Sequence, residues 1–434
     1  MKVSQLITLL AILCAAKFCQ AQSMFRGDAV HSGSYSGPAP RQFHRVKWKF
    51  ATGDRIVSSP VIDNKRIYFG GDDGNVYAVD AETGRQIWKC ATKGPVSSSP
   101  AVANGIVYAT SYDGKLYALS SETGAVKWKF ATAGERRFEA KGLDGMEPKN
   151  QTIADPFDVF LSSPVVVKNT VYFGSGDGNV YALDATTGEQ RWKFRTGDVV
   201  HASPAFANGV LFFGSWDSYF YAVDAASGKE KWRFHGGEDP LMHNQVGFQS
   251  SPAVVDGVVY TGCRDSNVYA LDAATGKEKW RCNNELSWVN SSPAVVQGKV
   301  FFDTSDTSLF RVVEATTGKQ LVRQQAKAPM FSSPAVAGDV VLIGVLNGTL
   351  EARDVKTGDL LWDYQVEKSK ENKGWVLTSD RKMNQPLSFY SNWREIPIVA
   401  VDRESGIGQI FSSPLVANGA VYFGSTDGFL YALE

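Results

Sequence analysis

The 434-residue chain is poor in the residues that most often carry covalent or metal chemistry. It contains five cysteines and five histidines. Two of the cysteines fall within the first 21 residues, and the other three are Cys90, Cys263 and Cys282. These three form no CxxC pair, no adjacent Cys-Cys and no zinc-like spacing, so the sequence predicts neither a disulfide framework nor a structural zinc site. Cys90 and Cys282 each follow a tryptophan by two residues, where similar stretches have phenylalanine, which indicates small core residues.

The chain also lacks net charge and long apolar runs. Lysine plus arginine and aspartate plus glutamate number 45 each, so no overall field attracts nucleic acid, and we expect no nucleic-acid partner. The apolar run from Leu6 to Ala16 is shorter than the roughly 20 residues that cross a bilayer, and no later segment is longer. We interpret residues 1–21 as a signal peptide cleaved after Ala21, which predicts a periplasmic or secreted protein without a transmembrane helix. A lipid anchor is not expected, because large residues precede both cysteines of this segment.

Repetition is what the chain has in abundance. A Ser-Pro dipeptide that opens an apolar run recurs eight times, with proline at positions 60, 100, 164, 204, 252, 293, 334 and 414. The basic spacing is about 40 residues, and the second and seventh copies carry long insertions. A period near 40 is typical of β-propellers and of some helical solenoids, so the local pattern has to decide between them.

Each repeat unit reads as four short strands. The fifth copy, "SSPAVVDGVVYTGCRDSNVYALDAATGKEKWRC", contains four runs rich in Val, Tyr, Leu and Trp that are separated by turn residues. The stretch "DAATGKEKW" is not expected to be helical, because glycine interrupts it and its residues alternate with a period of two. Asp272 should accept hydrogen bonds from backbone amides of the turn, and Gly276 should supply a positive φ. Eight such units predict an all-β fold, an eight-bladed β-propeller of four-stranded antiparallel blades.

Two details predict how the ring is closed and where its packing differs. The last copy stops after three strands at Glu434, whereas the stretch from Val46 to Gly53 has a tryptophan strand with no turn before it. Pairing the two would complete the last blade with the N-terminal strand and remove open sheet edges. In the sixth copy Val322 replaces the tryptophan and Glu314 replaces the aspartate, so we expect less aromatic surface between that blade and the next.

The eightfold pattern "SSPAVV(D/N)GVVYFGS.DGNVYALDAATGKEKWRF" resembles the pyrroloquinoline quinone (PQQ)-like β-propeller repeat family. The leader "FRGDAVHSGSYSGP" resembles the segment that often precedes such repeats. We therefore expect a leader at 22–45 and a propeller at 46–434, with inserts at 131–160, 235–248 and 364–410. The family includes quinoprotein dehydrogenases, the scaffold lipoprotein of outer-membrane assembly, and proteins without a known activity. The resemblance implies the fold and leaves the function open.

Propeller topology should bring the long blade-to-blade links to one face, here called the top face. The long links are 131–160, 235–248, 283–289 and 364–410. They carry polar and aromatic side chains that interrupt the repeat, among them His243, Asn244, Gln245, Trp375, Tyr390, Trp393 and Arg394. We interpret these inserts either as binding loops on a rigid scaffold or as lids that close the channel mouth.

The candidate site lies on the same face. The residue three before each repeat proline should line the channel, which gives Val57, Ser97, Leu161, His201, Gln249, Asn290, Phe331 and Phe411. The polar members His201, Gln249 and Asn290 fall together in blades four to six, where irregular turns add Trp216, Asp217, Arg264, Asp265 and Asp306. A flat aromatic, a histidine, amides and a guanidinium suit a small planar or anionic ligand. The alternative is a set of solvated turn residues with no ligand.

These features predict an exported, monomeric binding or scaffold protein that engages a protein partner of the cell envelope or a small ligand through its top face. The resemblance implies a place in cell-envelope or outer-membrane assembly. The alternative is a PQQ- and calcium-dependent dehydrogenase of alcohols or sugars, since PQQ needs basic, amide and aromatic groups and calcium needs oxygen ligands. Against it, the chain has neither an adjacent cysteine pair nor a haem CxxCH motif. No catalytic residue is assigned, because spacing ties no histidine to a serine or cysteine nucleophile, and metal ligands remain unknown.

Overall fold

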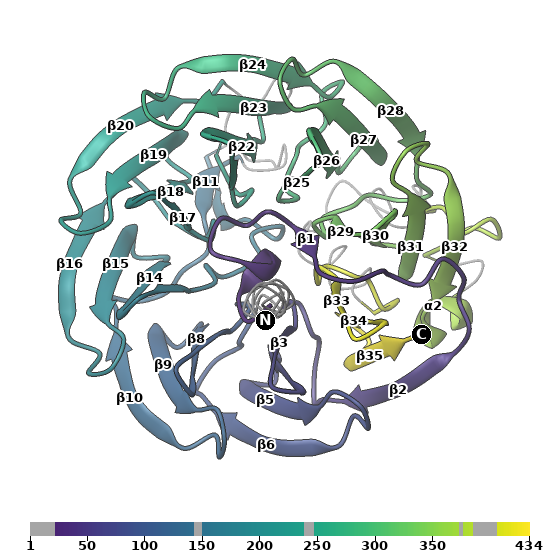
Figure 1. Ribbon diagram of the computed structural model, residues 1–434, viewed down its shortest axis with the longest axis horizontal. Helices are drawn as coiled ribbons and strands as arrows, with labels where there is room; N and C mark the ends of the chain where they lie inside the picture. The colour runs from purple at the N-terminus through teal and green to yellow at the C-terminus, as the bar shows by residue number, and fades with distance from the viewer. Residues whose placement is uncertain (1–21, 143–149, 238–246, 373–375, 385–405) are drawn as a thin grey trace, which may run out of the picture.

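The computed structural model describes residues 22–142, 150–237, 247–372, 376–384 and 406–434. Within them the chain forms eight sheets of four antiparallel strands that surround a central axis like the blades of a propeller (Figure 1). This arrangement confirms the predicted all-β, eight-bladed fold. The inserts 235–248 and 364–410 are described only in part, so His243, Asn244, Gln245, Trp375, Tyr390, Trp393 and Arg394 lie outside the described residues.

Blades 1 to 4 follow one another along the chain, and each runs from the innermost to the outermost strand. Blade 1 consists of β3 (Val61–Asp63), β4 (Arg66–Gly70), β5 (Asn75–Asp80) and β6 (Gln86–Ala91). Blade 2 consists of β7 (Ala101–Ala103), β8 (Ile106–Ser111), β9 (Lys115–Ser120) and β10 (Val126–Ala131). Blade 3 consists of β13 (Val165–Val167), β14 (Thr170–Gly174), β15 (Asn179–Asp184) and β16 (Gln190–Arg195). Blade 4 consists of β17 (Ala205–Ala207), β18 (Val210–Gly214), β19 (Tyr219–Asp224) and β20 (Glu230–His235).

Blades 5 to 7 repeat the same order, and blade 8 combines both ends of the propeller. Blade 5 consists of β21 (Ala253–Val255), β22 (Val258–Gly262), β23 (Asn267–Asp272) and β24 (Glu278–Asn283). Blade 6 consists of β25 (Ala294–Val296), β26 (Lys299–Asp303), β27 (Leu309–Glu314) and β28 (Gln320–Gln325). Blade 7 consists of β29 (Ala335–Ala337), β30 (Val340–Val345), β31 (Thr349–Asp354) and β32 (Leu360–Gln365). Blade 8 consists of β33 (Leu415–Ala417), β34 (Ala420–Gly424), β35 (Phe429–Leu433) and β2 (Val46–Ala51).

The N-terminal strand closes the ring as predicted. Strand β2 pairs antiparallel with β35, with Trp48 opposite Ala432. The backbone amides of His44 and Arg45 both donate to the carbonyl of Glu434, each at 2.9 Å. This pairing leaves no blade with a missing strand, and it ties the two ends of the propeller together.

The repeated turn "DAATGKEKW" is a socket for the tryptophan of the preceding blade. Gly276 has φ 72°, and a Cβ placed on it would lie only 2.6 Å from the ring of Trp232. The indole N–H of Trp232 donates to the carbonyl of Ala273 in the same turn, at 3.1 Å. Asp272 accepts the amide of Thr275 at 2.9 Å, as predicted. Glycine is therefore required twice at this position, for its backbone conformation and for the close approach of the indole.

The seam between blades 6 and 7 packs differently. Val322 lies where the other seams have tryptophan, and it packs directly on Gly358. A Cβ added to Gly358 would lie only 2.3 Å from the Cγ1 of Val322. Phe310 contributes a ring edge to the same spot, at 3.5 Å. On the blade 7 side, Arg353 and Glu351 form a buried ion pair at 2.6 Å. The expected loss of aromatic surface stays a prediction, because Phe310 supplies an aromatic ring beside the valine and the ion pair that lie where an indole packs in the other seams.

The leader crosses the face opposite the inserts and seals the channel there (Figure 1). Its backbone carbonyls accept hydrogen bonds of 2.7–3.0 Å from the innermost strands of six blades, through the pairs Ile62–Gln22, Val102–Ser23, Phe206–Ala29, Val254–Val30, Val295–Ser32 and Val336–Gly33. A short 3-10 helix, Phe25–Gly27, carries Phe25 at the channel. Strand β1 (Ser34–Tyr35) then adds to blade 7 in parallel with β29.

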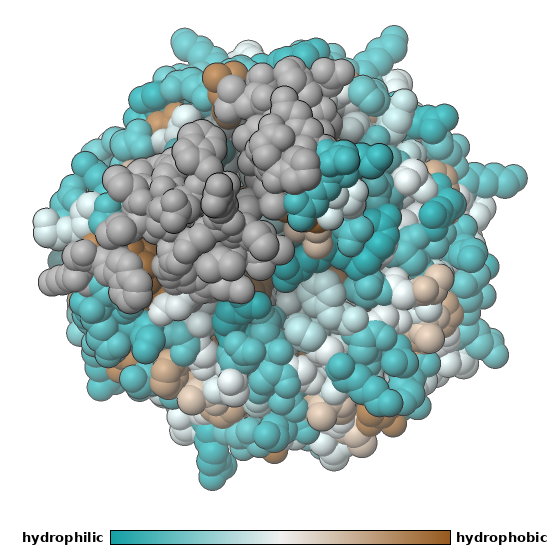
Figure 2. All heavy atoms as spheres, turned by 180° about the vertical axis from the view of Figure 1, so that it is seen from behind, coloured by the Kyte–Doolittle hydropathy of each residue, from teal (hydrophilic) through white to brown (hydrophobic). Residues whose placement is uncertain are grey.

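The described parts of the inserts are short. The 131–160 insert forms a hairpin of β11 (Glu139–Lys141) and β12 (Thr152–Ala154), and helix α2 (Glu367–Glu371) follows β32. The hairpin packs through Phe138 on Trp216, which lies in a turn of blade 4 on the top face. Seen from behind relative to Figure 1, the described part of the surface is mostly hydrophilic, with small scattered apolar areas (Figure 2). Among the described residues, no helix is long and apolar enough to cross a membrane.

Candidate functional site

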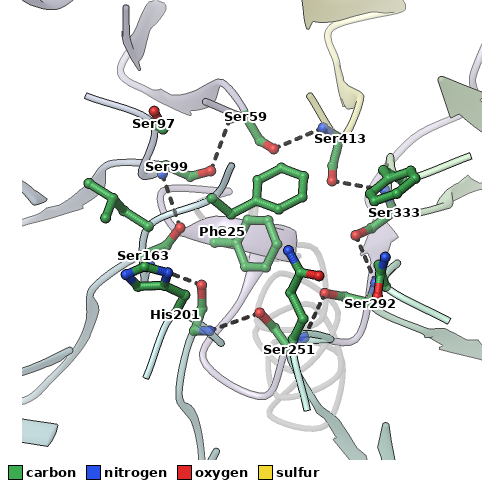
Figure 3. Close-up of a pocket in the computed structure, with 16 residues that line it drawn as sticks. Phe25, Ser59, Ser97, Ser99, Ser163, His201, Ser251, Ser292, Ser333 and Ser413 are labelled. Atoms are coloured by element: carbon green, nitrogen blue, oxygen red, sulfur yellow. Dashed lines mark hydrogen bonds between the residues drawn. The ribbon is translucent and has the colours of Figure 1, made fainter. Parts of the chain in front are cut away.

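Eight serines, one from each blade, form a closed ring of hydrogen bonds around the channel (Figure 3). The backbone N–H of each serine donates to the hydroxyl of the next blade's serine at 2.8–3.1 Å, through Ser59, Ser99, Ser163, Ser203, Ser251, Ser292, Ser333 and Ser413. The proline that follows each serine has no N–H, so it leaves no unpaired donor on the innermost edge. The Ser-Pro repeat therefore satisfies the inner rim of the propeller.

The channel inside this ring is nearly filled. Phe25 of the leader lies among the serines (Figure 3). The remaining cavity has a volume of about 30 Å³, which leaves room for about two water molecules. The residues three before each repeat proline line this cavity or a second one beside it, as predicted for Val57, Ser97, Leu161, His201, Gln249, Asn290, Phe331 and Phe411.

The insert 131–160 covers part of the channel mouth on the top face. Its last residues run across the mouth, where Phe157 stacks on Phe331 with ring centres 6.0 Å apart and meets Trp288 edge-on. Phe160 meets Phe411 edge-on at 6.2 Å. We call the segment 155–160 the plug. The apolar contacts of the plug occupy the position that a ligand in the channel mouth would take.

The guanidinium of Arg264 anchors the plug. It is fully buried between the rings of Trp216 and Trp288, at 4.3 and 4.2 Å from their centres. Its Nη1 donates to the carboxylate of Asp155 at 2.5 Å, and its Nε and Nη2 donate to the side-chain oxygen of Gln249. Gln249 in turn donates to the carbonyl of Phe157 at 2.9 Å. Burial raises the pKa of the Asp155 carboxyl, an effect that Arg264 partly offsets.

His201 forms a second anchor. Its Nδ1 lies 2.7 Å from Asp158 and its Nε2 lies 2.9 Å from Glu135, and both carboxylates come from the same insert. Burial alone would lower the pKa of His201, but Asp158 and Glu135 outweigh it and raise the pKa to about 10. At neutral pH the ring is therefore a cation that donates from both nitrogens. A histidine in this state holds the insert in place and cannot act as a general base.

The structure brings some of the predicted site residues together and separates others. Trp216, Arg264, Gln249 and His201 converge beneath the plug, as the sequence indicated. Asn290 lies beside them in the wall of the channel cavity, and among the described residues neither of its side-chain polar atoms has a hydrogen-bond partner. The other predicted residues are the three aspartates of the irregular turns, Asp217, Asp265 and Asp306.

The three turn aspartates do not face the site. Asp217 accepts the hydroxyl of Tyr221 at 2.7 Å, and Asp265 accepts the hydroxyl of Tyr269 at 2.5 Å. Each also accepts a backbone amide from the adjacent link. Asp306 is exposed and accepts only a neighbouring serine hydroxyl among the described residues. The same aspartate-to-tyrosine bond, four residues apart, occurs in the regular turns, so Asp217 and Asp265 are turn-forming residues.

Sequence reasoning missed the groups that complete the site. Asp155, Asp158 and Glu135 are the acceptors for the two cations, and Trp288 is the second face of the sandwich. All four belong to inserts that depart from the repeat. This departure indicated that the inserts are functional, but it did not indicate which of their residues face the channel.

PQQ with calcium does not fit these residues. PQQ is planar and stacks on aromatic rings, but the slot between Trp216 and Trp288 is filled by Arg264. The buried carboxylates Asp155 and Asp158 already accept hydrogen bonds from Arg264 and His201. No group of three or more His, Cys, Asp or Glu side chains in the described ranges could hold a metal ion. We therefore derive no chemistry through this cofactor.

Comparison with known proteins agrees with the fold. A family model described as outer membrane protein assembly factor BamB matches residues 41–146, 146–287 and 264–406. Subunit 1 of the cytochrome c-linked methanol dehydrogenases of Methylobacterium organophilum and Methylorubrum extorquens is 34% identical over 104 residues. That match spans 22% of this chain and 16% of the dehydrogenase subunit.

Solved structures show the same architecture at low sequence identity. BamB from Moraxella catarrhalis superposes with a TM-score of 0.63 at 14% identity, covering 90% of this chain and 97% of the other. A europium-containing methanol dehydrogenase superposes with a TM-score of 0.70 at 15% identity, covering 99% of this chain and 100% of the other. The computationally designed protein Ika8 gives 0.63 at 16% identity, with coverage of 88% and 97%. With the family model matching most of its length, the chain belongs to the PQQ-like β-propeller family described as outer membrane protein assembly factor BamB.

Proposed function

We propose that this protein is an exported scaffold that binds a protein partner of the cell envelope through its top face, in outer-membrane assembly. The description of the matching family names outer-membrane protein assembly. The top face carries the inserts, which are the parts of the chain that depart from the repeat. A closed ring of eight blades gives these inserts a rigid base, since the serine ring ties every blade to the next and a tryptophan packs in every seam except the one between blades 6 and 7.

One observation carries this proposal. The chain closes its own channel, with Phe25 at one end and the plug at the other, and it satisfies the buried cations His201 and Arg264 with its own carboxylates. Groups that are fully paired within the protein have little left to offer a ligand in the channel. The exposed residues in the described parts of the inserts are then the part of the top face that we expect a protein partner to contact.

Site-specific photo-crosslinking in cells would test this proposal. We would place a photoreactive phenylalanine analogue at exposed Glu139 or Lys382 beside the inserts, and at exposed Asn104 in a turn on the leader face as the control. We expect crosslinks to an outer-membrane protein from the first two positions and none from Asn104. Crosslinks from Asn104 alone, or none from any position, would refute a top-face partner.

The methanol dehydrogenase match favours the second candidate, a quinoprotein dehydrogenase of alcohols or sugars. Its test is direct: the purified protein is titrated with PQQ in the presence of calcium, and reduction of an artificial electron acceptor by methanol or glucose is followed. Because the aromatic slot is filled by Arg264, we expect no PQQ binding at micromolar concentrations. Stoichiometric uptake with dye reduction would replace the scaffold proposal with the enzyme.

A further inference from the structure

A second cavity opens on the top face beside the plug. We call it the side pocket, and its volume is about 310 Å³. It is bounded by the channel residues Val57, Ser97 and Phe411 of blades 1, 2 and 8, and by Arg137 and Val159 of the insert. Small-molecule sites begin at about 300 Å³, so this pocket has the size of a binding site for a small ligand.

The side pocket exists because the insert covers only part of the channel mouth. The channel residues of blades 3 to 7 line the filled cavity inside the serine ring, whereas Val57 and Phe411 line the side pocket. Pro95 at its rim is exposed, so the pocket communicates with solvent. It is therefore accessible without any movement of the plug.

Of the two guanidiniums in the pocket, only that of Arg55 forms an ion pair among the described residues. Arg55 is paired with Asp72 at 3.1 Å, and Asp72 also accepts the hydroxyl of Ser97 at 2.9 Å. Arg137 forms no ion pair with any residue in the described part of the chain. Burial lowers the pKa of Arg137, but its hydrogen bond to the phenol of Tyr112 and the nearby carboxylates of Asp158 and Asp72 raise it above its ordinary value. Both acids are held by other donors: Asp72 as above, and Asp158 by His201 at 2.7 Å and by the amide of Phe138 at 2.8 Å.

The rest of the lining is apolar or hydroxylic. Val57, Val159 and Phe411 form the apolar wall, and Tyr112 adds a phenol beside Arg137. A guanidinium binds a carboxylate through two parallel donors, and an apolar wall next to it favours a compact hydrocarbon body on the same molecule. Phosphate or sulfate would leave this wall uncovered.

We propose that the side pocket binds a small organic carboxylate, with its carboxylate on Arg137 and its apolar body against Val57, Val159 and Phe411. The pocket shares the insert 131–160 with the proposed partner surface, but its test measures a small ligand on the purified protein and therefore succeeds or fails whether or not the protein is a scaffold.

The test uses 4-fluorobenzoate as the probe and its neutral analogue 4-fluorobenzamide as the matched ligand, with binding to the full mature chain followed by fluorine NMR. Three variants are compared with the wild type: Arg137→Gln removes the guanidinium, Val159→Trp fills the pocket, and Arg136→Gln is the control. Arg136 is adjacent in sequence but pairs with Asp198 on the surface. Unchanged circular dichroism and melting temperature establish that each variant is folded.

We expect 4-fluorobenzoate to bind, with its dissociation constant raised about tenfold or more by Arg137→Gln and within about twofold of wild type in Arg136→Gln. Val159→Trp should abolish binding even if Arg137→Gln does not fold, and the benzamide should bind at least about tenfold more weakly than the benzoate. The proposal is overturned if the benzoate does not bind at about 10 mM. It is equally overturned if Arg137→Gln and Val159→Trp bind as the wild type does, or if the benzamide binds equally well.

Discussion

Replacing Asp155 by asparagine should release the plug at a large cost in stability. Asparagine keeps the shape of the side chain and can still accept the amide of Phe157, which Asp155 now accepts at 2.7 Å. What it removes is the negative charge beside the fully buried guanidinium of Arg264. The substitution therefore tests the charge and leaves the packing almost unchanged.

The expected magnitude follows from burial. Removing one partner of a buried ion pair leaves an uncompensated charge and costs about 3 to 5 kcal/mol. The stacking of Arg264 between two indoles and its bonds to Gln249 persist, so we expect about 3 kcal/mol. The matched control is Arg136→Gln, which breaks the surface pair with Asp198 in the same insert and should cost about 0 to 1 kcal/mol.

Two measurements report the effect. Urea unfolding followed by tryptophan fluorescence gives the change in the free energy of unfolding. Hydrogen exchange then shows whether the loss is local, because the amides of Phe138 and Phe157 are bonded to Asp158 and Asp155 and should exchange faster if the plug opens. In the double variant with Arg264→Met, most of the loss should be recovered, since no unpaired charge remains.

The result that would refute this reasoning is also clear. If Asp155→Asn and Arg136→Gln lower the stability equally, the buried pair does not hold the plug. Strict additivity of Asp155→Asn and Arg264→Met in the double variant would likewise show that the two groups are not coupled.

Three further predictions concern the other anchors and seams. The pKa of His201 is raised from 6.5 to about 10, so its stabilising effect is complete below pH 6.5 and is lost as the pH rises toward 10. Between pH 7 and 9 the wild type should lose about 1 kcal/mol per pH unit relative to His201→Gln, and parallel urea-unfolding profiles would contradict this. Arg26→Met should raise the melting temperature, because the buried guanidinium has no hydrogen-bond partner among the described residues and the neighbouring buried carboxyl of Asp303, whose pKa burial raises, can take up a proton; a fall would show that the two groups act as a charge pair. Trp280→Ala should lower the free energy of unfolding, measured with urea, by about 3 to 5 kcal/mol, whereas Val322→Ala at the equivalent position should lower it by about 1 to 2 kcal/mol. Equal losses would contradict the interpretation that the packed indole stabilises the seam.

The fold was predictable because its repeat unit occurs eight times in the sequence. Each Ser-Pro dipeptide marks an inner strand, so a wrong interpretation of one copy would have conflicted with the seven others. Each glycine four residues before a tryptophan marks a socket. Closure of blade 8 by residues 46–51 followed from counting strands at the two ends. The different packing between blades 6 and 7 followed from the single missing tryptophan at position 322.

The candidate site was predictable only in part. The walls of the channel belong to repeat positions, so His201 and Gln249 could be placed at the mouth from their distance to a proline. Asp217 and Asp265 looked like site residues because their turns are irregular, yet the tyrosine four residues after each one marks them as turn-forming. The same spacing of aspartate and tyrosine occurs in the regular turns of the other blades.

The sequence by itself determined the number of blades, their order, the closure of the ring and the residues that line the channel, because these depend on local patterns that every copy repeats. Only the tertiary structure decided what those residues bind. Asp155 lies 109 residues from Arg264 and Asp158 lies 43 residues from His201, and both acids belong to an insert with no repeat to fix its path. The path of such an insert depends on long-range packing and on the pairing of buried charges, which local periodicity does not encode.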